Sequence, residues 1–118
     1  MTKSVIIKEK SKTLALRIIK LYRYLHKKHE YVLSKQILRS GTSIGANVCE
    51  AIRAPSKSDF YAKMNISLKE TSETEYWLEI LYESGYIDQK SFDSINLDCS
   101  ELLRILTAIC KSKNKIDG

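Results

Sequence analysis

Proline and glycine, the residues that most often break or bend a chain, are scarce: the 118 residues include one proline and four glycines. Folds built from many strands need many turns, and turns favour these two residues. A chain of a few long helices needs few turns, so the scarcity favours an all-α fold. A chain of this length buries one continuous core, and we expect residues 1–118 to form a single domain.

Long apolar runs are missing as well. Near the N-terminus the longest run is Val5-Ile6-Ile7, which is too short for the core of a signal peptide. No later segment approaches the roughly 20 apolar residues that a helix needs to cross a bilayer. We therefore predict a cytoplasmic protein without a membrane partner.

The cysteines do not form a disulfide pattern. Cys49, Cys99 and Cys110 are odd in number, widely separated and surrounded by apolar or helical sequence. Such cysteines indicate a reducing compartment rather than a disulfide framework. We expect all three to be small buried hydrophobic residues.

Residue patterns typical of catalysis and metal binding are also lacking. His26 and His29 lie three residues apart in a lysine-rich helix end, without cysteines or carboxylates at ligand spacing. The Glu-x-x-His motif of di-iron bundles is absent, as are Gly-x-Ser-x-Gly and Cys-x-x-Cys. We predict that the protein is not an enzyme and has no catalytic residue, metal or cofactor.

Apolar residues recur at alternating steps of three and four, the spacing of one helix face, over four segments. The predicted helices cover about residues 8–28, 32–54, 57–84 and 88–113. Short connections make neighbouring helices antiparallel. The expected fold class is all-α, an antiparallel up-and-down four-helix bundle.

Each predicted helix has one core stripe. The stripes consist of Leu14, Ile18, Leu21 and Leu25; then Leu33, Ile37, Gly41, Ile44, Val48 and Ala51; then Phe60, Met64, Leu68, Thr71, Thr74, Leu78 and Leu81; and finally Phe92, Ile95, Cys99, Leu102, Leu106 and Ile109.

Two glycines, Gly41 and Gly45, lie within the second helix. Each costs about 1 kcal/mol relative to alanine, and close approach of another helix is the usual compensation.

Helix ends are marked by residues with known capping chemistry. Pro55 ends the second helix, because its ring disfavours helical geometry at the preceding residue. Ser56 and Asp59 have the spacing of a capping box, with aspartate in place of the usual glutamate. Gly85 is placed for a C-cap and Asp88 for an N-cap.

Charge is unevenly distributed along the chain, whose net charge is +6. Residues 1–39 contain eleven lysines and arginines against Glu9 and Glu30, whereas residues 40–90 contain eight acidic and five basic residues. Three interpretations remain open. The basic segment forms a surface for a polyanion, it complements the acidic segment of another copy, or it is a solvated face without a partner.

Basic and aromatic residues alternate along the first predicted helix, so phosphate contacts and base stacking are both available. Tyr22 and Tyr24 supply the rings, unless they pack inside the bundle and the lysines serve only solubility. No recognised nucleic-acid-binding motif occurs, so binding should be salt-sensitive and weakly sequence-specific. The predicted phosphate contacts are Lys20, Arg23, Lys27, Lys28 and Lys35.

A second stripe of polar residues accompanies the core stripe of the second helix. Arg39 and Glu50 lie eleven residues apart, about three turns, and therefore share a face. With Glu73 of the third helix they suggest a buried polar network. Such a network is either a ligand or interface site, or a structural network that fixes the register of the helices. We favour the structural network. The candidate members are Gln36, Arg39, Ser43, Asn47, Glu50 and Glu73.

The second helix also carries a more specific pattern. Residues 33–51, LSKQILRSGTSIGANVCEA, resemble the signature of the 23S rRNA intervening-sequence proteins, a bacterial family of four-helix bundles. The run Ser58-Asp59-Phe60 and residues 68–78, LKETSETEYWL, are similar to its third helix, and residues 102–107, LLRILT, to its last. The resemblance covers nearly the whole chain. Cys49 departs from the pattern, which has a larger or charged residue there.

The resemblance implies a bundle that assembles into a five-fold ring, with no known enzymatic activity and no settled molecular role. Accessory proteins of diversity-generating retroelements, a related group, share the fold and the ring and bind nucleic acid and a reverse transcriptase through basic surfaces. That role is an analogy, because a fold does not determine a function.

Together these observations predict a non-enzymatic homo-oligomer that binds RNA or DNA backbone through its basic first helix. The alternative is a protein-interaction scaffold ring that recruits an unidentified protein partner and has no nucleic-acid role. A ring needs two different surfaces on each subunit, and the basic first helix and the acidic third helix are the candidates.

Overall fold

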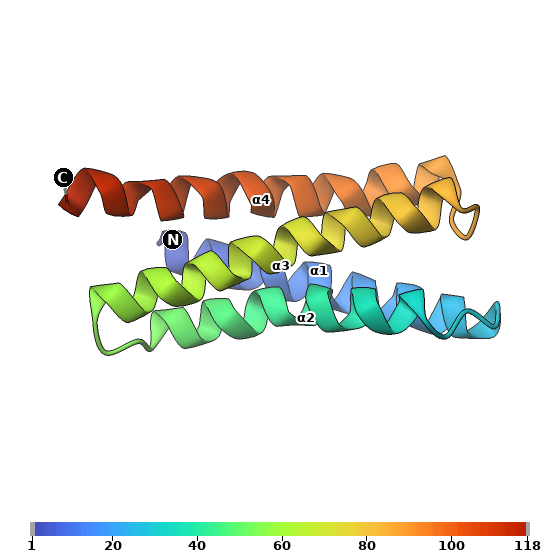
Figure 1. Cartoon of the computed structure of the whole chain (residues 1–118), viewed down its shortest axis with the longest axis horizontal. Coiled ribbons are helices and arrows are strands. Elements are labelled where there is room, and N and C mark those ends of the chain that lie inside the picture. The colour runs from blue at the N-terminus through green and yellow to red at the C-terminus, as the bar shows by residue number, and fades with distance from the viewer. Residues whose placement is uncertain (1, 118) are drawn as a thin grey trace.

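A computed structural model of the chain describes the backbone of residues 2–117 and the side chains of residues 2–113. The described backbone forms four helices and no strand. Consecutive helices run antiparallel in a bundle of 48 × 24 × 21 Å (Figure 1). The predicted all-α, up-and-down four-helix bundle is confirmed. Its helices are α1 (Lys3–Lys27), α2 (Leu33–Ile52), α3 (Lys57–Glu83) and α4 (Gln89–Asp117).

Two helices are longer than their apolar periodicity indicated. α1 begins at Lys3 rather than near residue 8, because the Thr2 hydroxyl accepts a hydrogen bond from the backbone N–H of Val5 at 3.3 Å and caps it. α4 continues to Asp117 instead of ending near residue 113. The α1 extension adds the apolar run Val5-Ile6-Ile7, of which Ile7 lies seven residues before Leu14 on the same face and is fully buried. The α4 extension is mostly polar and therefore gave no periodic signal.

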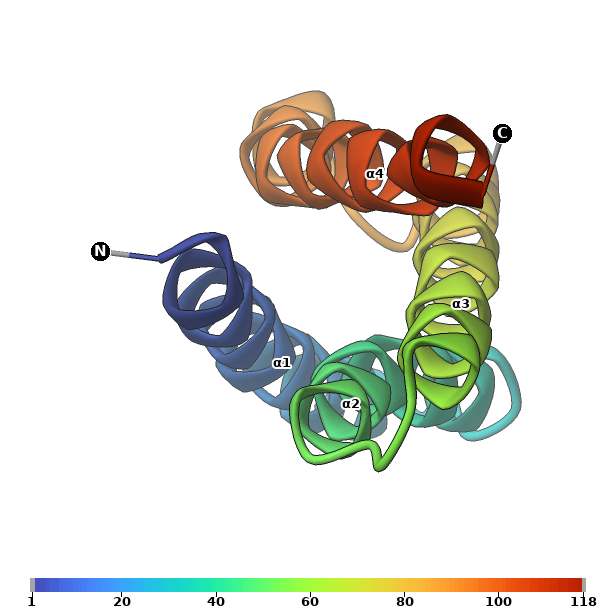
Figure 2. The same ribbon diagram turned by 90° about the vertical axis from the view of Figure 1, so that its left-hand side faces the viewer.

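The helices surround one core, which the predicted stripes fill. Viewed along the bundle, α1 packs on α2, α2 on α3 and α3 on α4, whereas α1 and α4 are the least closely packed neighbours (Figure 2). Ile7 and Ile87 also belong to the core, although the stripes omitted them. Leu33, Phe60, Leu68, Phe92 and Ile109 are only partly buried at its edge.

α1 and α2 approach each other closely at the two helical glycines. A Cβ atom added to Gly41 would lie 2.9 Å from both γ carbons of Ile18. A Cβ atom on Gly45 would lie 3.2 Å from the hydroxyl oxygen of Ser11. The expected close approach is confirmed, and tight packing of α1 on α2 offsets the cost of glycine within a helix.

α2 and α3 pack through small hydroxyl residues rather than through apolar side chains alone. The Thr74 hydroxyl donates to the Ser40 hydroxyl at 2.9 Å, and the Ser67 hydroxyl donates to the backbone carbonyl of Ile44 at 2.8 Å. All three side chains are fully buried. Because each is hydrogen-bonded, the helices approach without leaving a buried polar group unsatisfied.

The predicted caps are present. The Ser56 hydroxyl accepts from the backbone N–H of Asp59 at 3.1 Å, and the Asp88 carboxylate accepts from that of Ser91 at 2.8 Å. Gly85 has a φ of 86°. The backbone N–H of the following residue, Tyr86, donates to the carbonyl of Leu81 at 2.9 Å. These bonds satisfy backbone groups that helix ends leave unpaired.

The cysteines differ from one another in exposure. Burial, with smaller contributions from Glu75 and Asp98, raises the pKa of the Cys99 thiol to about 12. Cys110 is partly buried. The prediction of burial is wrong for Cys49, which is exposed because the next position after buried Val48 turns about 100° away from the core.

None of the helices in residues 2–117 has an apolar stretch long enough to cross a membrane.

Replacing Gly41 with alanine tests the close α1–α2 contact. Overpacking costs about 1–3 kcal/mol, and the 2.9 Å contacts with Ile18 place Gly41→Ala in the upper part of that range. Alanine returns about 1 kcal/mol of helix propensity, so we expect the free energy of unfolding to fall by about 1–2 kcal/mol. Chemical denaturation measures the change. Gly45→Ala is the matched control and should change stability less, because the Ser11 hydroxyl is free to rotate away. A Gly41→Ala variant as stable as the wild type would contradict the close contact.

Candidate nucleic-acid interface

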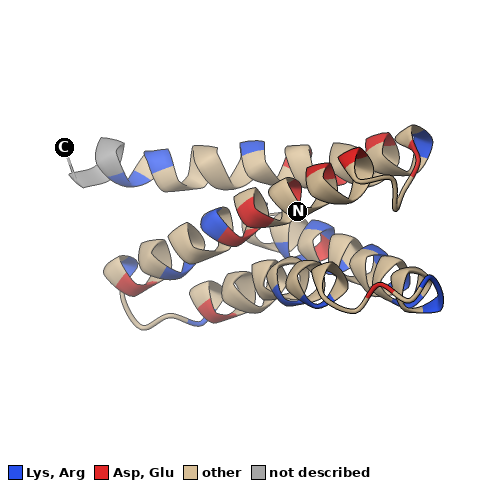
Figure 3. Ribbon diagram, turned by 45° about the vertical axis from the view of Figure 1, so that its right-hand side comes forward, with Lys and Arg blue, Asp and Glu red and all other residues tan. Residues whose placement is uncertain are grey.

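The five predicted phosphate contacts lie at one end of the bundle. The last turns of α1 carry Lys20, Arg23 and Lys27. Lys28 follows that helix directly, and Lys35 lies in the first turn of α2. Basic residues accumulate on α1 and α2 toward this end, and acidic residues on α3 and α4 (Figure 3). We call the exposed set the basic end; its members are Lys20, Arg23, Lys27, Lys28 and Lys35.

The charge of the basic end is not compensated within the described part of the chain. Among residues 2–113, none of its five members forms an ion pair. Basic residues nearer the middle of the bundle behave differently. Lys10 pairs with Glu101, and the Arg17 guanidinium donates to the Asp98 carboxylate at 2.8 Å. The structure therefore pairs Lys10 and Arg17 with carboxylates of α4 and leaves the five cations of the basic end without an ion pair within residues 2–113.

α1 ends in a turn that orients this region. His29 has a positive φ of 64°, a conformation in which histidine is more common than most residues with a side chain. The backbone N–H of His29 donates to the carbonyl of His26 at 3.0 Å, and that of Glu30 to the carbonyl of Leu25 at 2.9 Å. This pair of bonds closes α1 and directs the chain into α2.

Glu30 caps the start of α2 and was not identified from the sequence, where its only signal was its position as one of two acidic residues in the basic segment 1–39. Its carboxylate accepts backbone hydrogen bonds from Val32 at 3.2 Å, Leu33 at 2.9 Å and Ser34 at 2.8 Å. The residue is 6% exposed. Burial opposes the charged form, but these bonds outweigh it and lower the pKa of Glu30 below its ordinary value.

Tyrosines and histidines gather at the same turn. The His26 ring lies between Tyr22 and Tyr31, with centroids 4.2 and 5.1 Å away. Tyr22 is half-buried in this cluster, so it packs within the fold, whereas Tyr24 and Tyr31 are 44% and 48% exposed. Of the two predicted stacking rings, Tyr24 is the more exposed, and the Lys28 Nζ lies over one face of it, 5.7 Å from the ring centroid. Tyr31 is an exposed ring that the sequence reading missed.

The predicted polar network forms only in part. The Arg39 guanidinium donates to Glu70 at 3.0 Å and to Glu73, which also accepts from the Trp77 indole at 2.9 Å. The Trp77 bond, with Arg39 as a further cause and against the effect of burial, lowers the pKa of Glu73. Arg39 is half exposed, so the prediction of a buried network is wrong. Glu70 and Trp77 are members that the sequence reading missed.

Of the remaining candidates, Ser43 contacts only the backbone of Arg39, whose carbonyl accepts from the Ser43 hydroxyl at 2.6 Å. Asn47 donates to the carbonyl of Ser43 at 2.8 Å within α2, and Glu50 lies 3.6 Å from Lys63 of α3. Gln36 is exposed. Three helical turns place side chains about 16 Å apart along the axis, which is too far for one continuous set of hydrogen bonds.

A metal site requires several ligand side chains close together. Across residues 2–113, no three histidine, cysteine, aspartate or glutamate side chains gather closely enough to hold a metal ion.

The fold and the basic end define a small antiparallel four-helix bundle with an uncompensated positive surface. Comparison with known proteins identifies its family. The family model described as 23S rRNA-intervening sequence protein matches residues 3–108. The chain therefore belongs to the 23S rRNA-intervening sequence protein family, and the resemblance noted in residues 33–51 is confirmed.

A solved relative supports this assignment. The chain is similar to the crystal structure of a protein with unknown function from the S23 ribosomal protein family of Bacteroides thetaiotaomicron VPI-5482, with 50% sequence identity and a TM-score of 0.91. The similarity covers 93% of this chain and 99% of that one. No curated protein matches the chain.

Glu30 provides a pH-dependent test of the turn that supports the basic end. We expect Glu30→Gln to lower the free energy of unfolding at neutral pH, by up to about 2 kcal/mol, because a neutral amide is a weaker cap. Folding lowers the pKa of Glu30, so its charged form stabilises the protein above the ordinary value of about 4.3. That stabilisation is lost as the pH falls through the lowered pKa.

Denaturation curves at a series of pH values measure this difference. The gap between wild type and Glu30→Gln should close below about pH 4. Glu9→Gln, which removes an exposed carboxylate from α1, serves as the control and should show little gap at any pH. A gap for Glu30→Gln that stays constant from pH 7 to pH 3 would contradict the charged cap.

Proposed function

We propose that this protein is a cytoplasmic, non-enzymatic homo-oligomer that binds RNA or DNA backbone through the basic end. The observation that carries the proposal is the exposure of Lys20, Arg23, Lys27, Lys28 and Lys35 without ion-pair partners among residues 2–113. Five unpaired cations at one end of a small bundle are strongly attractive to a polyanion. No chemical step is part of the proposed role.

Binding of this kind has a measurable salt dependence. Each cation that contacts a phosphate releases a counterion, so the logarithm of the affinity falls with the logarithm of the salt concentration. Five contacts correspond to a slope of about −3.5 on single strands and about −4.5 on duplex. The basic end contains no recognition helix positioned as in known motifs, so the affinity should depend little on base sequence.

A protein-interaction scaffold is the second candidate, and exposed apolar side chains favour it. Val32 is 70% exposed and Leu97 is 66% exposed, and neither contributes to phosphate binding. The exposed Glu79 and Glu83 of α3 offer an acidic surface complementary to the basic end of another copy. Such head-to-tail contacts close into a ring, and similarity to the family favours five subunits. In this case the ring recruits a protein partner and nucleic acid is not involved.

Charge reversal distinguishes the two functions. We expect the triple variant Lys20→Glu, Arg23→Glu, Lys27→Glu to abolish binding of labelled RNA and DNA in fluorescence anisotropy, because three attractive contacts become repulsive. The matched control reverses three exposed lysines on α3 and α4: Lys57→Glu, Lys69→Glu, Lys111→Glu. Both variants change the net charge equally, so the control should retain most of the affinity. Equal loss in both variants, or no binding by the wild type at low salt, would contradict the basic end as the binding surface.

The oligomeric state is tested separately by light scattering at micromolar concentration. A five-fold ring should have five times the 13.6 kDa mass of one subunit. The mass should also fall at high salt if basic and acidic surfaces meet between copies, because exposed charges are screened. A mass of one subunit at low and at high salt would contradict the proposed homo-oligomer.

A further inference from the structure

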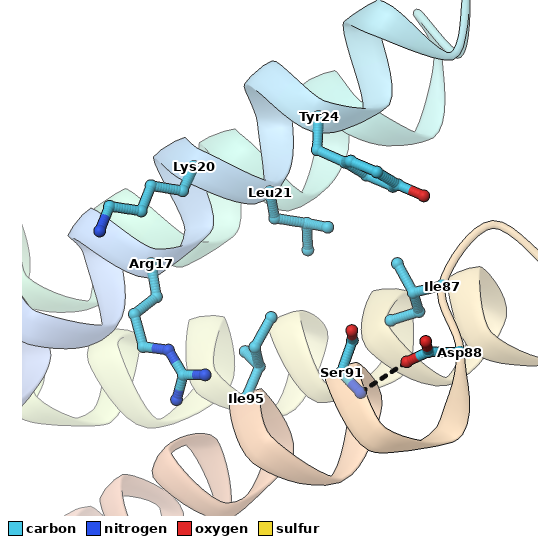
Figure 4. Close-up of a pocket in the computed structure, with 8 residues that line it drawn as sticks. All are labelled: Arg17, Lys20, Leu21, Tyr24, Ile87, Asp88, Ser91 and Ile95. Carbon is cyan, nitrogen blue, oxygen red and sulfur yellow. Dashed lines mark hydrogen bonds between the residues drawn. The ribbon is translucent and has the colours of Figure 1, made fainter.

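A hollow of about 610 Å³ opens between α1 and α4 beside the basic end. One wall belongs to the second half of α1, and the other to the turn before α4 and the first turns of that helix (Figure 4). The hollow exists because α1 and α4 are the least closely packed neighbouring helices of the bundle. It is lined by Arg17, Lys20, Leu21, Tyr24, Ile87, Asp88, Ser91 and Ile95.

The lining has an apolar floor and a polar rim. Leu21, Ile87 and Ile95 project into the space between the helices and are core residues, each less than a tenth exposed (Figure 4). Tyr24 is the aromatic side chain of the lining and is 44% exposed. A flat group of moderate size that enters the hollow therefore meets aliphatic side chains below it and an aromatic ring at its edge, which suits a planar aromatic ligand.

One end of the hollow is held in place by Arg17. Its guanidinium donates to Asp98 at 2.8 Å, to the carbonyl of Ser94 at 3.1 Å and to the Ser94 hydroxyl at 2.6 Å, all on α4. These bonds connect α1 to α4 and engage Arg17 fully. Lys20, one turn further along α1, forms no ion pair within residues 2–113. Lys20 is therefore the cation at the rim that is free to contact a phosphate.

The opposite wall carries a negative charge. The backbone N–H of Ser91 donates to the Asp88 carboxylate at 2.8 Å, and this bond lowers the pKa of Asp88. This exposed carboxylate at the edge of the hollow repels free phosphate but accepts hydrogen bonds from amino groups. The matching ligand is anionic at one end and carries hydrogen-bond donors at the other, as a nucleotide does when its base has an exocyclic amino group.

We infer that the hollow holds one unpaired base of a nucleic acid strand whose backbone lies on the basic end. Tyr24 packs against the base, Lys20 contacts a flanking phosphate, and Asp88 accepts a hydrogen bond from the exocyclic amino group. This inference rests on the proposed function and adds a preference to it. Bases in a duplex are stacked and paired, whereas single strands and loops present bases that enter pockets. The protein should therefore prefer unpaired nucleotides to duplex.

Tyr24 variants test the preference for unpaired strands. Anisotropy titrations compare a labelled single-stranded RNA with the same strand annealed to its complement. Tyr24→Ala should weaken single-strand binding by about 5- to 150-fold, the range for loss of one base–aromatic stack, and should leave duplex binding unchanged. Tyr24→Phe keeps the ring and should bind as the wild type does. Tyr76→Ala, which removes an exposed tyrosine from α3, is the control and should have no effect.

The role of Asp88 is tested with two homopolymers whose bases differ in the group at C4 and in the proton on N3. Oligo(C) presents an amino group where oligo(U) presents a carbonyl oxygen, so the wild type should bind oligo(C) more tightly. Asp88→Asn keeps a helix N-cap but replaces an acceptor with a group that also donates. It should reduce the ratio of oligo(C) to oligo(U) affinity, and this ratio is insensitive to the change in net charge.

The outcomes separate the inference from the proposed function. Salt-sensitive binding with equal affinity for strand and duplex, unchanged by Tyr24→Ala, would overturn the inference and leave backbone binding in place. An oligo(C) to oligo(U) ratio that is the same in wild type and Asp88→Asn would likewise overturn the assignment of Asp88. Absence of binding to every nucleic acid at low salt would overturn the proposed function and the inference together.

Discussion

The close packing of α2 against both of its neighbours is the constraint on which the rest of the structure depends. On the α1 side the absence of a side chain at Gly41 lets Ile18 pack directly on the α2 backbone. On the α3 side, Ser40, Ser67 and Thr74 are short enough for a close approach; Thr74 donates to the Ser40 hydroxyl and Ser67 to the backbone carbonyl of Ile44. α2 thereby fixes α1 and α3, and α4 then packs mainly on α3. The looser α1–α4 side follows from this order, because two helices held by other neighbours do not need to meet along their full length.

This arrangement also decides where charge is neutralised. Along the length of the bundle, cations of α1 and α2 lie beside carboxylates of α4 and α3, so Lys10, Arg17 and Arg39 find partners. These pairs are largely exposed, and their contribution to stability is small. The cations of the basic end are exposed and form no ion pair within residues 2–113. The proposed binding surface is thus built from cations that the fold does not use for its own ion pairs.

Membership in the 23S rRNA-intervening sequence protein family connects this chain to a solved structure whose function is unknown. The proposed function therefore rests on physical features of this chain. The basic end, the exposed Tyr24 and the mixed lining of the hollow lie next to one another, and one strand of nucleic acid is long enough to contact all three. The exposed Leu97 lies in α4, away from the basic end, whereas the exposed Val32 lies in the α1–α2 turn between Lys28 and Lys35.

The sequence by itself determined the four helices, most of their core residues, the caps at Ser56, Gly85 and Asp88, the close contact at Gly41 and the family. These features depend on short-range periodicity and on the chemistry of single residues, which a sequence displays directly. Only the tertiary structure decided that Arg39 pairs with Glu70 and Glu73 but not with Glu50, that Tyr22 packs while Tyr24 is accessible, that Cys49 faces outward, and that Glu30 caps α2. Periodicity places a residue on one face of its own helix. Which side chains meet, and which spaces stay open between helices, depends on the rotation and distance of one helix relative to another.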